Sequence, residues 1–374
     1  MLKEAILGKV QACMQKAEVD ALLLFTSPET FSGYWQIFGT NAAEAGIITK
    51  SGKMIVVTWS ILEEVVRQDS WADDVVGYFP YQIATIGDKK VETLFQVLKR
   101  VLAQNVSPDS KIGLEEGSMS SPQLAAVKNS IPDMTFQDVT SQLNDAMAPK
   151  AVEQLKFIQK AIRIADQGAE AGVRAAKLGV TEFEVAGRIA GALSSAGSYQ
   201  VTFPVTVLSG PNSQFLGKYP TTRKIRKGDL VLMDLGPVFK GYNADICRTV
   251  VIGKPSPRRR KMLEATLDAL DSAIDAIRPG VKAWEVDQVA REVFRKHGFD
   301  GHFVHHLGHP VFGPWGPMLI PGSETILREG MTFTLEPGVY LPRDGGVRIE
   351  DNVIVTNRGA RKLDRSERRL WPDT

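Results

Sequence analysis

The sequence has few of the residues that build disulfide scaffolds or membrane spans. Two cysteines, Cys13 and Cys247, occur in 374 residues, which excludes a disulfide framework and a cage of cysteine metal ligands. The longest apolar runs, such as residues 21–25, are far too short to cross a bilayer. The first five residues include an acid and precede no long apolar segment. We therefore expect no signal peptide and a cytoplasmic location.

An excess of charge of either sign is also missing. The chain has 45 Lys and Arg residues against 43 Asp and Glu residues, a formal net charge of +2. This balance gives no reason to expect a nucleic acid or a membrane surface as a partner. A hydrophobic fraction of 43% is ordinary for a soluble globular protein, and the length suggests two domains.

Histidine is missing from the first 296 residues. All five histidines lie between His297 and His309. Scattered histidines would indicate surface positions, whereas this clustering points to a site in the C-terminal part of the chain.

The first 147 residues predict an α/β domain without a recognisable catalytic motif. Helices are expected at 3–17, 61–68 and 91–103, and strands at 19–25, 46–49, 54–58, 111–114 and 135–139. The turn at 50–53 predicts a hairpin. Residues 148–150, Ala-Pro-Lys, interrupt the pattern. We place the domain boundary there, giving domains 1–147 and 148–374.

The second domain contains an internal repeat. Residues 179–185 match residues 280–286 at an offset of 101, and residues 228–236 match 330–338 at an offset of 102. Residues 179–185 follow a long predicted helix at 152–177, and residues 280–286 follow another at 261–277. Each of these segments begins a further helix. In the first of them, Thr181 and Glu184 form a capping box. We predict an α+β fold of two ααβ units about a pseudo-twofold axis. Equivalent carboxylates, such as Asp234 and Glu336, would meet near that axis.

Two aspartates fall on one face of a predicted hairpin. Asp234 ends the apolar strand 230–233, and Asp245 lies on the return strand 243–249. Any two-residue turn between these strands places both side chains on the same face. Because two neighbouring half-buried carboxylates repel each other, a divalent cation between them would offset the cost.

Glu336 and Glu350 are the counterparts in the second half. Their spacing of 14 residues does not give a shared face in a simple hairpin, and the prolines and glycines between them predict an irregular connection. His309, after a predicted strand, adds an imidazole, a common ligand of transition metals. Four carboxylates and one imidazole favour Mn²⁺ or Co²⁺, with Fe²⁺ or Zn²⁺ compatible. Their charge suits two ions about 3.5–4 Å apart.

These residues carry a resemblance to a known family. The sequence resembles that of the "pita-bread" metallopeptidases. The five metal ligands of that family match, in order and spacing, Asp234, Asp245, His309, Glu336 and Glu350. That family includes methionine aminopeptidases, Xaa-Pro aminopeptidases, prolidases and creatinase. Residues 150–360 carry the strong resemblance, and the first domain is more weakly similar to the N-terminal domain of the prolidase and creatinase branch.

The resemblance implies a dinuclear metal-dependent hydrolase. In the family a metal-bridged hydroxide attacks the scissile amide carbonyl, which makes Glu336 the expected proton acceptor. His305 matches another family histidine that supports the site, although a structural role bonding the backbone is equally open. The resemblance also implies a small peptide or amide substrate and a homodimer.

Three departures from the family pattern affect substrate handling. Gly217 stands where peptide-cleaving members carry a histidine, and its neighbour Lys218 is the nearest polar candidate. Gly316 stands in place of a second histidine, and Pro310 replaces a glycine after His309. A lysine at 218 could stabilise an oxyanion, or it could be an exposed loop residue.

Three alternative functions are compatible with these residues. The leading one is an Xaa-Pro dipeptidase or aminopeptidase, and the alternative is hydrolysis of a non-peptide C–N bond in a small metabolite. A non-catalytic binding protein ranks last, because all five ligand positions are kept. Among the remaining residues, we expect Cys247 to pack or to line the site rim, Arg348 to pair with a carboxylate, and residues 365–369 to form a surface tail.

Overall fold

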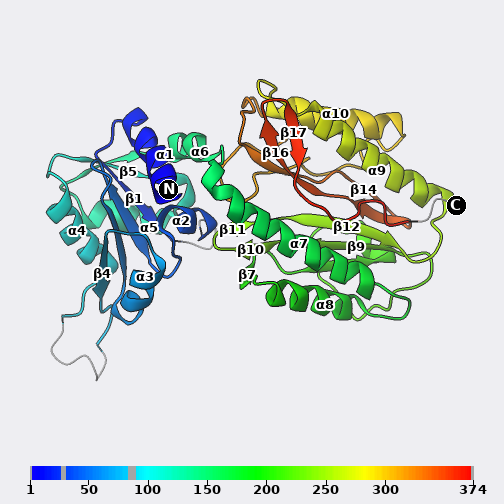
Figure 1. The fold of residues 1–374 in the computed structure, drawn as a ribbon, viewed down its shortest axis with the longest axis horizontal. Coiled ribbons are helices and arrows are strands. Elements are labelled where there is room, and N and C mark those ends of the chain that lie inside the picture. Colours follow the sequence, from blue (N-terminus) through cyan, green and yellow to red (C-terminus); the bar gives the residue numbers. More distant parts are fainter. Residues whose placement is uncertain (1, 27–30, 83–89, 372–374) are drawn as a thin grey trace. The chain divides into compact units, whose positions relative to one another are not determined.

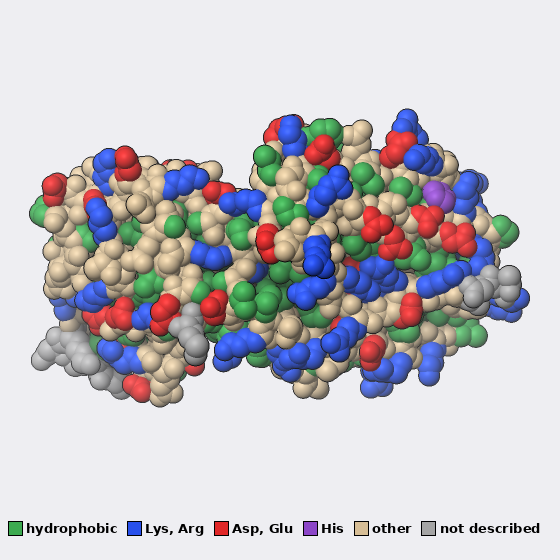
Figure 2. All heavy atoms as spheres, turned by 45° about the horizontal axis from the view of Figure 1, so that its top comes forward, with side chains coloured by type: hydrophobic (Ala, Val, Ile, Leu, Met, Phe, Trp, Pro, Cys, Tyr) green, Lys and Arg blue, Asp and Glu red, His purple; other side chains and the backbone are tan. Residues whose placement is uncertain are grey.

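The chain divides into two compact units in the computed structural model, which describes residues 2–26, 31–82 and 90–371 (Figure 1). The first unit comprises residues 1–153 with 313–315, and the second comprises 154–312 with 316–374. The domain boundary expected at residues 147–148 stays a prediction. No helix in the described ranges combines the length and apolar character needed to cross a bilayer. Basic and acidic side chains are interspersed on the face shown in Figure 2.

The first unit is built on a mixed six-stranded sheet with the strand order β4-β3-β2-β1-β5-β6. Strands β1, β2 and β3 pair antiparallel, and β4, β5 and β6 join them in parallel. Every residue of β1 is buried, as its continuous apolar run requires. The elements are α1 (Leu2–Lys16), β1 (Ala21–Phe25), α2 (Phe31–Phe38), β2 (Ala45–Thr49), β3 (Met54–Trp59), α3 (Glu63–Asp69), β4 (Asp74–Tyr78), α4 (Leu94–Asn105), β5 (Lys111–Leu114), α5 (Ser121–Ser130), β6 (Thr135–Asp138) and α6 (Thr140–Met147).

The second unit places strands between two pairs of helices. Helices α7 and α8 lie side by side, as do α9 and α10, and the pairs flank the strands (Figure 1). The elements are α7 (Leu155–Ala175), α8 (Glu182–Ser195), β7 (Gln200–Val201), β8 (Thr206–Ser209), β9 (Leu230–Leu235), β10 (Pro237–Phe239), β11 (Tyr242–Asn243), β12 (Ile246–Val251), α9 (Pro257–Ala276), α10 (Ala283–Lys296), β13 (Thr332–Leu335), β14 (Gly338–Leu341), β15 (Gly345–Arg348), β16 (Asp351–Thr356) and β17 (Gly359–Lys362).

The two halves of this unit repeat the same hydrogen bonds. The Gly179 N–H donates to the Ile225 carbonyl at 2.9 Å, and the Gly280 N–H donates to the Leu327 carbonyl at 3.0 Å. The predicted capping box at the start of α8 is present, with both reciprocal bonds formed. The predicted duplicated pita-bread fold is confirmed, with strands β9 and β13 in equivalent places.

The segment expected to be a surface tail also covers a buried arginine. Arg248, which is fully buried, donates to Asp351 Oδ1 at 2.9 Å, to Ser366 Oγ at 2.8 Å and to the Glu367 carbonyl at 2.9 Å. A guanidinium carries five N–H donors and must find acceptors when it leaves water. The expectation holds in part, because Arg365, Glu367 and Arg369 are exposed whereas Ser366 is buried against Arg248.

This arrangement predicts a large stability difference between two arginine substitutions. Arg248→Met leaves Asp351 buried beside fewer cations and should lower the free energy of unfolding by about 3–5 kcal/mol. Arg258→Ala breaks the ion pair with Asp344, but the Arg258 side chain is 64% exposed. Arg258→Ala should therefore lower the free energy of unfolding by less than about 1 kcal/mol. Urea denaturation of the metal-free proteins measures both, and equal small effects would contradict the assignment.

Candidate metal centre

A tight hairpin places the two aspartates. Asp234 on β9 pairs directly with Cys247 on β12, and the same register places Asp245, just before β12, on the same face. The two turn residues, Lys240 and Gly241, have φ angles of 48° and 72°. Positive φ at both positions is the geometry of a type I′ turn, which suits the twist of the strands. The shared face is therefore the one that the two-residue turn predicts.

A second hairpin places the two glutamates. Leu335 pairs with Asp351 and Gly338 pairs with Arg348, so the same register puts Glu336 directly opposite Glu350. A simple hairpin with a two-residue turn does not give this shared face, as the spacing of 14 residues indicated. Residues 342–344 form a three-residue connection, which shifts the register by one and turns both carboxylates to the same side.

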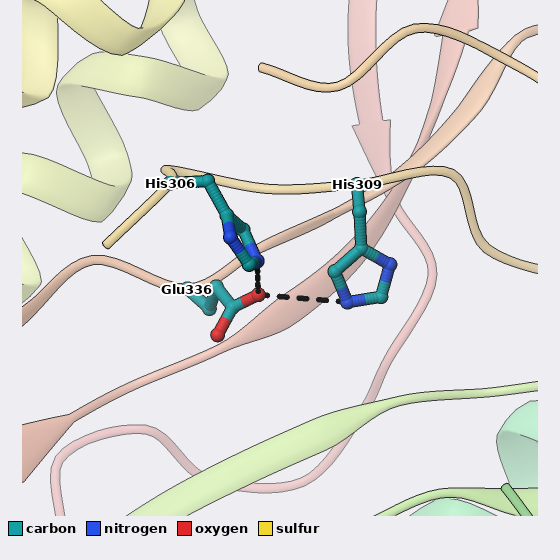
Figure 3. A group of neighbouring side chains, drawn as sticks. All are labelled: His306, His309 and Glu336. Atoms are coloured by element: carbon teal, nitrogen blue, oxygen red, sulfur yellow. Dashed lines mark hydrogen bonds and ion pairs between the residues drawn. The ribbon is translucent and has the colours of Figure 1, made fainter. Parts of the chain in front are cut away.

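Two histidines extend toward Glu336 from the segment before β13 (Figure 3). His306 Nε2 lies 2.8 Å from Glu336 Oε1, and His309 Nε2 lies 3.5 Å from the same oxygen and 3.6 Å from Asp245 Oδ2. The strand expected before His309 does not form, and this segment is irregular. A Cβ at Gly308 would stand 2.0 Å from the Thr334 carbonyl oxygen, so the chain beside His309 can approach β13 only with glycine there.

All five residues expected to hold metal lie within this one cluster. Three overlapping groups each bring their ligand atoms within 4.8 Å of one another. The groups are Asp234, Cys247 and Glu350; Asp245, His309 and Glu350; and His306, His309 and Glu336. Strands and loops of both repeats supply them, as the duplicated fold requires.

The carboxylates carry an electrostatic cost that side chains alone do not relieve. Burial raises the pKa of Asp245 and of Glu350 well above the ordinary values, and it raises that of Asp234. Among the described residues, Asp234 Oδ1 and Asp245 Oδ1 are buried without a hydrogen-bond partner. Unpaired buried oxygens with this donor chemistry fit divalent cations, which would supply the missing partner.

Glu336 differs from the other three carboxylates. Burial alone would raise its pKa, but the hydrogen bond to His306 and the positive charge of Arg348 outweigh burial and lower its pKa to about 2. Arg348 also bonds to Asp234, which confirms the expectation that it pairs with a carboxylate. Glu336 is therefore ionised at neutral pH.

The two other candidate catalytic residues, His305 and Lys218, form their hydrogen bonds with other partners. His305 Nε2 lies 2.9 Å from the Tyr340 hydroxyl. The histidine that hydrogen-bonds to Glu336 is His306. Sequence reasoning gave His306 no role, because adjacent residues carry no signal of which ring faces a strand. Lys218 lines one cavity together with Asp234 and Gly217, and its Nζ donates to Asn212 Oδ1 at 2.6 Å.

Two further side chains lie beside the candidate ligands. Asn352 accepts from the Asp245 N–H at 3.2 Å and donates to Asp364 Oδ1 at 2.8 Å, so it fixes the backbone of one candidate ligand. Cys247 is fully buried against Leu232 and Tyr340, so of the two roles expected for it the structure shows packing.

Comparison with known proteins agrees with this geometry. Residues 156–357 match the model of metallopeptidase family M24, and residues 7–146 match the creatinase/prolidase N-terminal domain. The chain belongs to metallopeptidase family M24. It is therefore a metal-dependent hydrolase of the peptidase type, as the resemblance in the sequence implies.

Two Xaa-Pro dipeptidases and one solved prolidase are similar to this protein over three quarters of the chain or more. An Xaa-Pro dipeptidase of Pyrococcus horikoshii is 30% identical over 366 residues, 97% of each protein. An Xaa-Pro dipeptidase of Pyrococcus furiosus is 34% identical over 285 residues, 75% of this chain and 79% of that protein. The crystal structure of the prolidase from Pyrococcus horikoshii OT3 superposes with a TM-score of 0.83 at 28% identity, covering 98% of this chain and 99% of that one.

Replacing one candidate carboxylate ligand should affect metal binding and protein stability differently. Asp245→Asn should lower metal content and abolish turnover, because a neutral amide is a weaker ligand and leaves an incomplete donor set. The metal-free variant should be at least as stable as the metal-free native protein, since one repelling charge is gone. Elemental analysis and urea denaturation measure the two effects. Full metal occupancy with normal turnover would show that Asp245 is not a ligand.

His305 predicts a specific pH dependence of stability. Burial lowers its pKa from 6.5 to about 4, so between these values the unfolded chain binds a proton that the folded protein does not. The stability contribution is complete above pH 6.5 and is lost as the pH falls toward 4. Between pH 7 and pH 5 the free energy of unfolding of the metal-free native protein should fall by about 2 kcal/mol more than that of the metal-free His305→Gln variant. Parallel urea-denaturation results for the two proteins would contradict this.

Proposed function

We propose that Asp234, Asp245, His309, Glu336 and Glu350 hold two divalent ions, with Mn²⁺ or Co²⁺ preferred over Fe²⁺ or Zn²⁺. The observation that carries the proposal is the convergence of these donors in overlapping groups, with two carboxylate oxygens unpaired in the described structure. Hard oxygen donors with a single imidazole suit Mn²⁺ and Co²⁺ better than softer ions.

The protein's own side chains supply the remaining catalytic elements. Bound divalent ions would polarise the scissile carbonyl and activate a water molecule. Glu336, ionised and held by its hydrogen bond to His306, would accept the proton from that water. Arg348 holds Asp234 in place from the side of the cavity, so the carboxylate cannot turn away from its ligand position.

The size of the cavity suits a small substrate such as a short peptide. The cavity beside Asp234 has a volume of about 260 Å³ and has apolar walls, which include Phe203, Leu208 and Leu232. Pockets for drug-sized ligands usually measure about 300–1,000 Å³. Since relatives that match along most of the chain are Xaa-Pro dipeptidases, we propose that this protein hydrolyses Xaa-Pro dipeptides. A homodimer and a cytoplasmic location stay predictions.

An assay of peptides and non-peptide amides tests this function. Mn²⁺-loaded protein should release proline from Ala-Pro, lose this activity in a chelator and regain it on addition of Mn²⁺. Glu336→Gln should reduce kcat by at least about 10²-fold, because the proton acceptor is lost. Cleavage of cyclic or N-acylated metabolites with no cleavage of any dipeptide would favour the alternative function.

A further inference from the structure

A buried glutamate organises the loop that carries Lys218. Glu182, the first residue of α8, has 0% of its surface exposed. Its carboxylate accepts from the Ser209 N–H at 2.6 Å, from the Thr221 N–H at 2.9 Å and from both of their hydroxyls at 2.7 Å. The carboxylate therefore ties together the two ends of the loop 209–221.

In the second half the equivalent helix start forms without a carboxylate at this position. In the first half, the Glu182 N–H donates to the Arg223 carbonyl at 3.2 Å, and in the second half the Ala283 N–H donates to the Thr325 carbonyl at 2.9 Å. The equivalent helix start therefore forms equally well with alanine. Glu182 serves a purpose that belongs to the first half alone.

Glu182 also determines how Asn212 is oriented. A carboxylate only accepts hydrogen bonds, so the Asn212 amide must turn its NH₂ group toward it, with Nδ2 at 3.0 and 3.1 Å from the two oxygens. The Asn212 carbonyl oxygen then points the other way and accepts from Lys218 Nζ at 2.6 Å. The ammonium also lies 5.2 Å from the centre of the Phe215 ring.

The lysine ammonium retains donors for a ligand. An ammonium has three N–H donors. Within the described part of the chain one is donated to Asn212, and the side chain lines the cavity beside Asp234. Two cations, Lys218 and Arg348, line this cavity together with Asp234, and Arg348 is bonded to Asp234. The Lys218 ammonium is therefore the cation that is not paired with one of the expected metal ligands, which suits a small molecule that carries both a carboxylate and a hydrolysable bond.

We propose that Lys218, positioned by Glu182 through Asn212, binds the terminal carboxylate of a short peptide substrate. The proposal rests on the proposed peptidase function and names the substrate group that this site selects. It gives Lys218 a binding role in place of the catalytic one expected from the sequence, since the contact that fixes its ammonium is Asn212 rather than one of the five metal donors. Glu182 and Asn212 are positioning residues, because they act through Lys218.

A matched pair of substrates tests the binding role. Ala-Pro carries the carboxylate, and Ala-prolinamide replaces it with a neutral amide. With Mn²⁺-loaded full-length protein, Lys218→Met should raise KM for Ala-Pro at least about tenfold with kcat nearly unchanged, because a charge-assisted hydrogen bond is lost. Its kcat/KM for the amide should stay at the native value. Lys218→Arg should retain most of the preference for Ala-Pro over Ala-prolinamide, and Asn212→Leu should weaken this preference.

Controls separate this role from general damage. Lys224→Ala removes an exposed lysine of the same region and should leave both substrates unaffected. Glu182→Gln introduces a donor where the loop needs acceptors and should weaken the preference. If that variant does not fold, Asn212→Leu alone tests the positioning. Equal loss of kcat/KM for both substrates on Lys218→Met would indicate a role in the reaction itself, and no change would make Lys218 a bystander. Either result overturns the proposal.

A binding measurement keeps the proposal testable if neither substrate is cleaved. Calorimetry with N-acetylproline and N-acetylprolinamide compares the acid and the amide directly. Tighter binding of the acid by the native protein, lost in Lys218→Met, would support the carboxylate site even though the proposed peptidase function had failed. Equal binding of both ligands would overturn the carboxylate site.

Discussion

Four neighbouring carboxylates, three of them buried and Asp234 partly buried, impose the main electrostatic constraint on this structure. Duplication brings Asp234 and Asp245 from one half against Glu336 and Glu350 from the other, in a place where burial disfavours their charged forms. Arg348 and His306 relieve part of their mutual repulsion, at Asp234 and at Glu336 respectively. The unpaired oxygens of Asp234 and Asp245 leave the rest to cations, so the cost of folding this site is also the driving force for metal binding.

The surrounding polar network holds the cluster in place. Asn352 fixes the backbone at Asp245, and the Arg248 guanidinium bonds to the Glu350 carbonyl and to Asp351. The segment 364–371 closes this network from outside, with the backbone N–H of Ser366 bonded to Asp166 at 2.9 Å. A site under such repulsion needs rigid support, and buried hydrogen bonds that are fully satisfied provide it.

Features set by short-range rules were predictable from the sequence. The capping box at Thr181, the hairpin of β2 and β3 and the shared face of Asp234 and Asp245 follow from local periodicity and turn chemistry. The repeat offset gave the duplicated fold. Features set by long-range contacts were not predictable. Strand β4, with Asp74 and Gly77 in its five residues, has weak strand character and forms because β3 offers an edge. The three-residue turn and the choice between His305 and His306 likewise depend on packing.

Anomalous diffraction from crystals of the Mn²⁺-loaded protein, recorded at the manganese absorption edge, tests the central claim most directly. The account predicts two strong peaks, each within bonding distance of carboxylate oxygens from the cluster, with His309 bound to one of them. Crystals that show a well-ordered cluster and no peak among Asp234, Asp245, His309, Glu336 and Glu350, or a peak only elsewhere on the protein, would contradict it.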